Sequence, residues 1–86
     1  MINGYAFKSG SYSKDGNYKI ITIKNVLDNK FITNSTNKIL EIPDNVIENQ
    51  KLKIGDVLIS LTGNVGRVCV VTEGECLLNQ RVAKII

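Results

Sequence analysis

The sequence predicts an α+β fold that is predominantly β, with a small twisted antiparallel or mixed sheet, or a partial barrel, and one short helix. Isoleucine, valine and threonine together supply 25 of the 86 residues, whereas alanine supplies two. This balance favours strands over helices. The apolar runs are short, and polar segments rich in asparagine and glycine separate them, as turns separate strands. The length allows one small domain, so we expect a single domain over residues 1–86.

The first half of the chain predicts strands that alternate with polar loops. The run at 18–24 is short and β-branched, which is typical of a strand. Asp15-Gly16, just before it, is a turn signal, and Asp28-Asn29 marks the tip of the next turn. The expected elements are, in order, a loop over 7–18, a strand over 18–24, a turn over 25–30, a strand over 31–33, a loop over 34–37 and a strand over 38–42.

The second half predicts one short helix followed by more strands. Pro43-Asp44 is expected to open a short helix or helical turn that continues through Gln50, with Asp44 as its cap. Residues 57–61 form a nearly continuous apolar run, which predicts a strand buried on both faces. The remaining expected elements are a turn over 62–66, a strand over 67–72 that completes a hairpin, a turn over 73–75, and strand residues 76–78 and 81–86 interrupted at Asn79-Gln80.

The composition indicates a domain of a reducing, cytoplasmic compartment. No basic segment followed by an apolar stretch comes after Met1, so no secretory leader is expected. No apolar run approaches the roughly 20 residues of a membrane span. Cys69 and Cys76 lie beside apolar residues and are expected to be small core hydrophobes. The net charge of +3 is compatible with a nucleic-acid-binding face as well as with an ordinary lysine-rich surface.

The sequence lacks the residue types that most catalytic and metal sites need. Histidine is absent, which removes Ser–His and Cys–His pairs, and two cysteines are too few for a zinc site. Gly63-Asn64-Val65-Gly66 lacks the lysine and hydroxyl residue of a phosphate loop, so it indicates a hairpin turn. Pro43-Asp44 is not followed by the acidic-x-Lys triplet of a nuclease. We therefore expect no catalysis, no metal and no cofactor.

Several short motifs occur here in an order that matches a known family. They are Gly4-Tyr5-Ala6-Phe7-Lys8-Ser9, the strand at 18–25 after a loop ending at Gly16, the segment Lys53-Ile54-Gly55-Asp56-Val57-Leu58-Ile59-Ser60-Leu61-Thr62-Gly63 followed by Gly66-Arg67, and Leu78-Asn79-Gln80-Arg81-Val82-Ala83-Lys84-Ile85. In this combination the chain resembles the target recognition domain of the specificity subunits of type I restriction–modification systems. The resemblance covers residues 4–85 and implies the core of the DNA methylase specificity domain as the fold.

The resemblance implies that the chain binds double-stranded DNA and does no chemistry. In that family the specificity subunit directs methyltransferase and restriction subunits to a DNA site. The sequence contains no counterpart of the long helices that dock the methyltransferase subunits, and family domains are longer, so we expect a shortened recognition domain. Phosphate contacts would set its register on the duplex, and contacts to base edges in the major groove would read the sequence.

The polar loops carry the side chains that we expect to contact DNA. Asparagine and glutamine can pair with adenine, and arginine with guanine. The expected DNA-binding residues are Lys8, Ser9, Ser11, Tyr12, Lys14 and Asn17, followed by Lys38 and Arg67. Tyr12 has an alternative role, packing down on the sheet. Asn64 is expected to supply left-handed backbone to its turn, Asp56 to tie the turn before its strand, and Asn79-Gln80-Arg81 to satisfy backbone groups at the strand break.

A second class of function is a non-catalytic structural or protein-interaction module. A small β domain leaves strand edges that can pair with another chain. In this alternative the chain forms a homo-oligomer and does not bind DNA by itself. The assembly state in solution separates the two classes.

Overall fold

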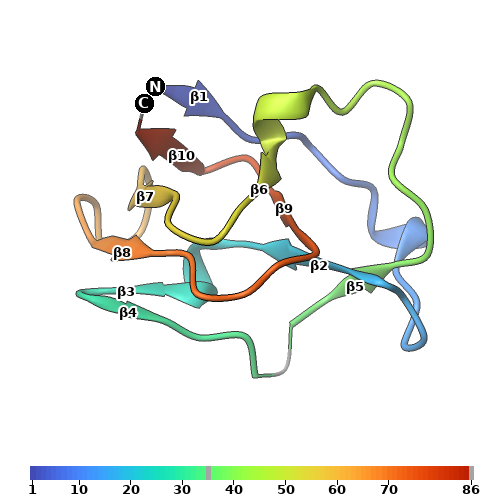
Figure 1. The fold of residues 1–86 in the computed structure, drawn as a ribbon, viewed down its shortest axis with the longest axis horizontal. Coiled ribbons are helices and arrows are strands. Elements are labelled where there is room, and N and C mark those ends of the chain that lie inside the picture. The colour runs from blue at the N-terminus through green and yellow to red at the C-terminus, as the bar shows by residue number, and fades with distance from the viewer. Residues whose placement is uncertain (35, 86) are drawn as a thin grey trace.

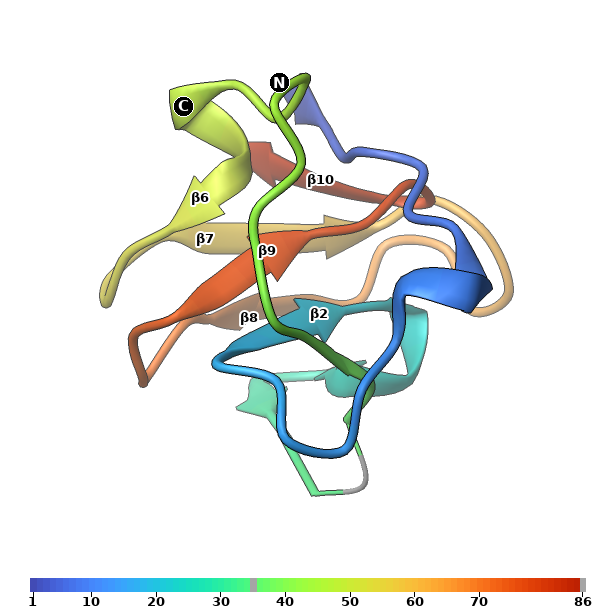
Figure 2. The same ribbon diagram turned by 90° about the vertical axis from the view of Figure 1, so that its right-hand side faces the viewer.

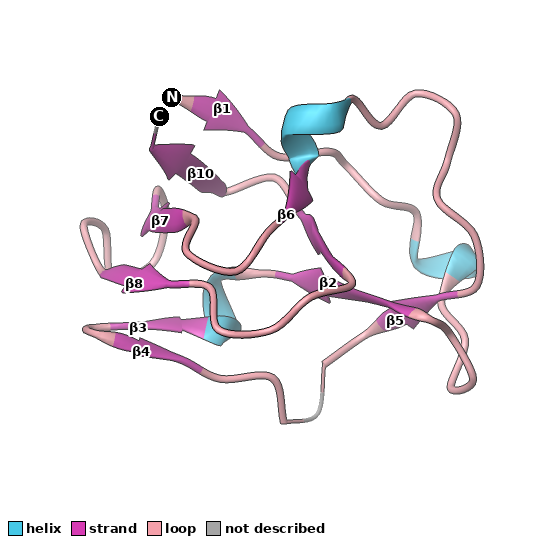
Figure 3. Cartoon of the chain, in the orientation of Figure 1, coloured by secondary structure: helices cyan, strands magenta, loops and turns pink. Residues whose placement is uncertain are grey.

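Ten short strands and three 3-10 turns make up the described part of the chain (Figure 1, Figure 3). The computed structural model describes residues 1–34 and 36–85, and for Ser9 it describes the backbone alone. The strands are β1 (Ile2–Asn3), β2 (Tyr18–Ile21), β3 (Val26–Leu27), β4 (Lys30–Phe31), β5 (Lys38–Ile39), β6 (Lys51–Leu52), β7 (Val57–Ser60), β8 (Val68–Val70), β9 (Cys76–Leu78) and β10 (Val82–Ile85). The turns are η1 (Ser9–Ser11), η2 (Ile23–Asn25) and η3 (Glu48–Gln50). The predominantly β class is therefore confirmed, and the described strands do not close into a barrel.

Two four-stranded sheets enclose the main core, and the β3–β4 hairpin packs against it. The first sheet has the order β1-β10-β7-β8 and is antiparallel throughout. The second has the order β5-β2-β9-β6 and is mixed, because β2 and β9 run parallel with Lys19 opposite Cys76. The first and last strands of the chain are neighbours, as the labels β1 and β10 in Figure 1 show.

The core between the sheets is built from the inward faces of these strands. Leu58 of the first sheet meets Ile21 and Leu78 of the second, and all three are fully buried. Cys69 and Cys76 are buried in the same cluster with free thiols, which confirms them as core residues. Burying a leucine or isoleucine side chain contributes about 1.5–3 kcal/mol, so these few residues supply much of the stability of so short a chain.

β7 is buried on one face, so the prediction that it is buried on both faces is wrong. Leu58 and Ser60 are buried, whereas Val57 and Ile59 are half-buried. The physical reason is that the antiparallel sheet packs on the core with one face, which produces alternating burial along each strand. The predicted hairpin is confirmed, since β7 and β8 pair antiparallel on either side of the 62–66 turn.

β2 ends earlier than the predicted strand over 18–24, because a capped turn follows it. The Thr22 amide donates to Asn25 Oδ1 at 2.8 Å, and the Lys24 amide donates to Thr22 Oγ1 at 3.3 Å. Such side-chain hydrogen bonds compete with the ladder of a sheet and end the strand.

The next two predicted strands are shorter than expected. The turn tip at Asp28-Asn29 is confirmed, and Asn29 has a left-handed backbone with φ 59°. The hairpin strands around it, β3 and β4, begin inside the range that was predicted as turn. The strand predicted over 38–42 ends at Ile39 as β5.

The short helix or helical turn predicted from Pro43-Asp44 to Gln50 is confirmed only at its end, where η3 ends at Gln50. The described residues contain no α-helix, and only η3, at the end of this range, is helical. The N-cap position of η3 is Ile47, so Asp44 is not its cap. The physical reason is that Val46 is buried and the segment is rich in asparagine and β-branched residues, which form helices poorly.

Two irregular segments cover the outer face of the second sheet. A small cluster of Ile20, Ile39 and Leu77 is covered by Phe7, Tyr12, Tyr18 and Ile42. Figure 2 shows the green segment after β5 crossing β9 on its way to η3. None of the helical turns described here has the length or apolar character to cross a membrane.

Candidate nucleic-acid interface

The segment 7–17 runs along β5, the edge strand of the second sheet. Tyr12 forms an antiparallel bridge with Ile39, and the Ser13 amide donates to the Lys38 carbonyl at 2.8 Å. The segment therefore extends the pairing beyond the sheet edge. This pairing fixes how its side chains lie relative to those of β5.

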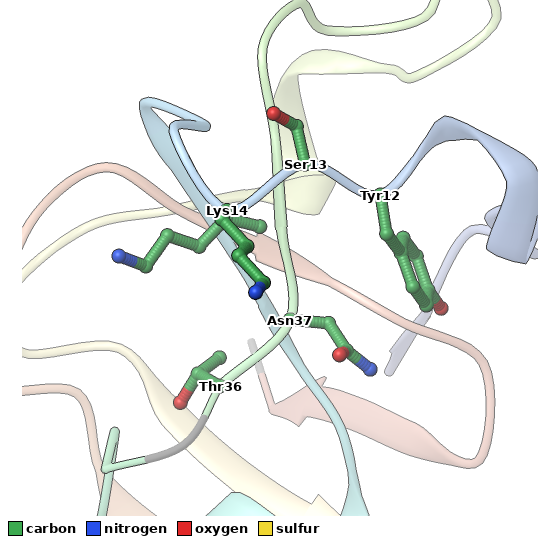
Figure 4. Close-up of a pocket in the computed structure, with 6 residues that line it drawn as sticks. Tyr12, Ser13, Lys14, Thr36 and Asn37 are labelled. Atoms are coloured by element: carbon green, nitrogen blue, oxygen red, sulfur yellow. The ribbon is translucent and has the colours of Figure 1, made fainter.

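A groove of about 200 Å³ lies between this segment and the chain leading into β5 (Figure 4). It is lined by Tyr12, Ser13, Lys14, Thr36, Asn37 and Lys38. Figure 4 shows the Tyr12 ring and the Asn37 carboxamide extending to the same side, whereas the Ser13 hydroxyl points away from them. Three of the expected DNA-binding residues, Tyr12, Lys14 and Lys38, thus come together at one opening.

Three further hollows adjoin this groove and share lining residues with it or with one another. The largest, about 390 Å³, is lined by Phe7, Tyr12, Thr22, Ile23, Lys24, Asn37, Asn79, Gln80 and Arg81. A second, of about 230 Å³, extends from Lys24 to Asn34, and a third, of about 220 Å³, extends from Lys24 to Arg67. We call this continuous surface the cationic face, and its cations are Lys14, Lys24, Lys38, Arg67 and Arg81.

None of the described residues that line the hollows of the cationic face is acidic. The ion pairs join Lys19 with Glu73, Lys51 with Glu48 and Lys84 with Asp56. In the part of the chain that the structure describes, the cations of the face have no carboxylate partner. Unpaired charges gathered on one side create a positive potential there, even though the net charge is only +3.

Three other expected residues of the first loop, Lys8, Ser11 and Asn17, do not line the cationic face. Lys8 and Asn17 are exposed, and the Ser11 hydroxyl donates to the Lys8 carbonyl at 2.6 Å within η1. The side chain of Ser9 falls outside what the structure describes. The structure therefore brings Tyr12, Lys14 and Lys38 together and leaves Lys8, Ser11 and Asn17 apart from them.

Tyr12 takes the packing role that the sequence left open, and it also lines the cationic face. Its half-buried ring packs against the Ile20–Ile39–Leu77 cluster. The same residue lines two of the hollows. A ring held by packing presents its hydroxyl with little further loss of side-chain entropy.

Sequence reasoning missed Lys24, Asn37, Gln80 and Arg81. Lys24 was hidden in the range predicted as strand, and Asn37 sat in a polar loop that was chosen only for Lys38. Gln80 and Arg81 are both exposed. For Gln80 and Arg81, the signal that could have identified them is a polar pair between two apolar strands.

The strand break between β9 and β10 has a firmly held backbone. The Asn79 amide donates to the Ile21 carbonyl at 3.1 Å, and the Gln80 amide donates to the Tyr5 carbonyl at 3.2 Å. A Cβ at Gly4 would come within 1.8 Å of the Asn79 oxygen, so the two segments touch. At this strand break the hydrogen bonds are made by backbone groups. The side chains of Gln80 and Arg81 line the largest hollow instead.

Two turn residues behave differently from each other. Asp56 Oδ2 accepts from the Lys53 amide at 2.8 Å and so ties the turn before β7, as predicted. Asn64 does not supply left-handed backbone to the β7–β8 turn, because Gly63 and Gly66 do, with φ of 68° and 91°. Glycine adopts that conformation without the steric cost that asparagine incurs.

Comparisons with known proteins give no independent identification. No protein-family model, curated protein or solved structure matches the chain. Within the described residues, no three histidine, cysteine or acidic side chains are grouped so that they could hold a metal ion. The function therefore has to be inferred from the geometry of the cationic face and from the motif resemblance.

Proposed function

We propose that this domain binds duplex DNA sequence-specifically, as the target recognition part of a type I restriction–modification specificity subunit. In this proposal it directs methyltransferase and restriction subunits to a DNA site and performs no catalysis itself. The single observation that carries the proposal is the cationic face. Five cations without carboxylate partners among the described residues surround hollows that are lined by amide and hydroxyl side chains.

The chemistry of this face matches the two kinds of contact that a DNA reader makes. Lysine and arginine side chains contact phosphates and supply most of the affinity. Carboxamides such as Asn37 and Gln80 can pair with the edge of adenine in the major groove. Open, acid-free hollows with cations, carboxamides and hydroxyls in their lining suit a duplex better than a small apolar ligand, which would need an enclosed apolar pocket.

The proposal is tested by measuring duplex binding at several salt concentrations. We expect wild-type affinity to fall steeply with salt, and K14A to reduce the slope of log affinity against log salt by about 0.9. Lys53→Ala is the matched control, because Lys53 is exposed but does not line the cationic face. Absence of duplex binding at low salt, or an equal effect of K53A and K14A, would contradict the proposal.

Sequence specificity needs a separate measurement. Selection from a random duplex library should give wild-type protein one preferred site. N37A should keep the salt slope and relax the preference at one position, because a carboxamide contacts a base edge and not a phosphate. If the protein binds the library without preferring any sequence, it binds DNA non-specifically and the proposed recognition role is contradicted.

An interaction module is a second candidate, and one observation favours it. Val70, Val57 and Ile85 lie directly opposite one another on three neighbouring strands of the first sheet. Val70 is 49% exposed and Ile85 41% exposed. An apolar row of this kind can pack against a second copy of the chain. Sedimentation of wild type and V70K distinguishes the candidates: a dimer that V70K dissociates supports the module.

A further inference from the structure

We infer that Lys24, Arg67 and Arg81 form a second phosphate-binding cluster, which holds the opposite backbone of the same duplex that Lys14 and Lys38 contact. This inference rests on the proposed function and specifies which part of the duplex each side of the cationic face takes. Lys24 and Arg81 were not among the DNA-binding residues expected from the sequence.

The three cations line one continuous depression. Lys24 lines three adjoining hollows, of which one also contains Arg67 and another also contains Arg81. The side chains come from three separate elements: η2, the end of the β7–β8 turn, and the connection between β9 and β10. Among the described residues none of the three has a carboxylate partner, so an anion would find the charges available.

The end of β7 holds both arginines by their backbones. The Ser60 amide donates to the Arg67 carbonyl at 3.0 Å, and the Arg67 amide donates back to the Ser60 hydroxyl at 3.0 Å. The next residue, Leu61, donates its amide to the Arg81 carbonyl at 2.8 Å. Ser60, the last residue of β7, and Leu61, which follows it, therefore fix the two arginine backbones relative to each other. A fixed backbone reduces the entropy that binding would otherwise cost.

The backbone of Arg81 is in a conformation that favours glycine. Its φ is +75°, in the left-handed region that L side chains rarely adopt. Asn29 and Glu75 share this backbone region, so the conformation alone does not mark a site. Arg81 is exposed, lines the largest hollow and has no carboxylate partner among the described residues, so its guanidinium is available to an anionic ligand.

The arrangement of the two clusters fits a duplex. The largest hollow shares Tyr12 and Asn37 with the groove of Lys14 and Lys38. Its lining adds Lys24 and Arg81, further amide and hydroxyl side chains, and the apolar Phe7 and Ile23. Figure 1 shows the blue loop before β2 at the right of the view and the turn between β7 and β8 at the left, so these two segments lie toward opposite ends of the molecule. A duplex presents two phosphate backbones with base edges between them. The two cation clusters would contact the two backbones, and the amide side chains would contact the base edges. A single strand has one backbone and would satisfy one cluster.

The inference is tested by salt titrations of wild type, K24A, R81A and K14A with a mixed-sequence duplex and with one of its single strands. We expect each substitution to lower the duplex slope by about 0.9, and R81K to preserve it. With the single strand, K14A should lower the slope by about 0.7, whereas R81A should leave it unchanged. K53A is the control that should change neither slope.

Arg81→Gly separates binding from folding. It removes the guanidinium and also relieves the backbone strain, so it should be at least as resistant to urea as wild type and yet bind the duplex with the reduced slope of R81A. If R81A and R81G leave the duplex slope unchanged while K14A lowers it, the second cluster is overturned and the proposed function stands. If R81A lowers the slopes for duplex and single strand alike, the assignment to the opposite backbone is overturned. If wild type does not bind the duplex, both proposals fail together.

Discussion

The Asn25 carboxamide donates to the Thr36 hydroxyl at 3.1 Å, and this contact joins η2 to the loop that leads into β5. η2 carries Lys24, and the loop carries Asn37, so two residues of the cationic face are positioned by the buried Asn25 side chain, which itself lines one of the hollows of that face. Asn25 is 5% exposed. Its Nδ2 also donates to the Ile32 carbonyl at 2.7 Å.

Asn25→Ala should destabilise the domain strongly. The change removes the partners of the Thr22 amide and the Ile32 carbonyl, and it leaves a cavity in the region between them. We expect the free energy of unfolding to fall by about 2–3 kcal/mol. Thr36→Val, which loses the contact to Asn25 and one to the Thr33 carbonyl, should cost about 1 kcal/mol. Urea unfolding measures both, and equal values for the two variants would show that Asn25 does not organise this region.

Glu73 should make the domain less stable in acid. The Lys19 ammonium, which donates a hydrogen bond to Glu73, holds the pKa of this carboxyl below its ordinary value, and a hydrogen bond from Thr33 acts in the same direction. A lowered pKa in the folded state means that the stabilisation is present above the pKa of the unfolded chain and is lost as the pH falls through the folded value. Thermal unfolding of wild type and E73Q across this acid range should converge at the lowest pH. A difference in melting temperature between wild type and E73Q that stays the same at every pH would contradict the stabilising interaction of Glu73 with Lys19.

The two thiols should resist alkylation while the domain is folded. Burial raises the pKa of the Cys76 thiol to about 11, and the charge of Glu73 acts in the same direction. Burial also raises the pKa of Cys69. Because the thiolate is the reactive species, iodoacetamide at neutral pH should modify Cys76 more than about a hundredfold more slowly than an exposed cysteine.

Asn17→Cys supplies the matched exposed thiol for that comparison, because Asn17 is exposed. Intact-mass measurement over time should show one rapid modification in N17C and none in wild type. In urea, wild type should gain two modifications. Rapid labelling of the folded wild type would mean that the core around β9 opens readily.

Gly16 and Gly10 offer a matched pair of substitutions in the same segment. A Cβ at Gly16 would lie 2.6 Å from backbone atoms of Ile39, whereas a Cβ at Gly10 meets nothing within 4 Å. Gly16→Ala must therefore push the 13–17 turn away from β5, and we expect a loss of about 2 kcal/mol or more. Gly10→Ala should be neutral or stabilising by about 0.4–1 kcal/mol. Thermal melts of both variants decide this, and equal melting temperatures would contradict it.

The fold was predictable where the signal is local. The β7–β8 hairpin follows from an apolar run, a glycine turn and a second apolar run, all close together in the sequence. The pairing of β2 with β9 was not predictable, because a parallel contact between Lys19 and Cys76 depends on the whole topology. The helix expected after Pro43 formed only at its end for a similar reason: burial of Val46 against the rest of the molecule decides the conformation of that segment.

The cationic face was predictable only in part. Lys14 and Lys38 stand out as cations in polar loops, but their proximity depends on the Tyr12–Ile39 bridge, which the sequence does not reveal. Lys24 looked like a strand residue because the capping by Thr22 and Asn25 involves side chains rather than a pattern of hydropathy. Arg81 was assigned to the strand break, and its left-handed backbone is visible only in three dimensions.

The place of β10 in the first sheet has a consequence for synthesis of the protein. β10 lies between β1 and β7, so residues near the beginning of the chain acquire their neighbour only when residues 82–85 have been made. A nascent chain on the ribosome therefore exposes unpaired edges on both sides of the missing strand, and such edges invite aggregation. Folding should be slow for so small a domain, since its decisive pairing joins distant parts of the chain.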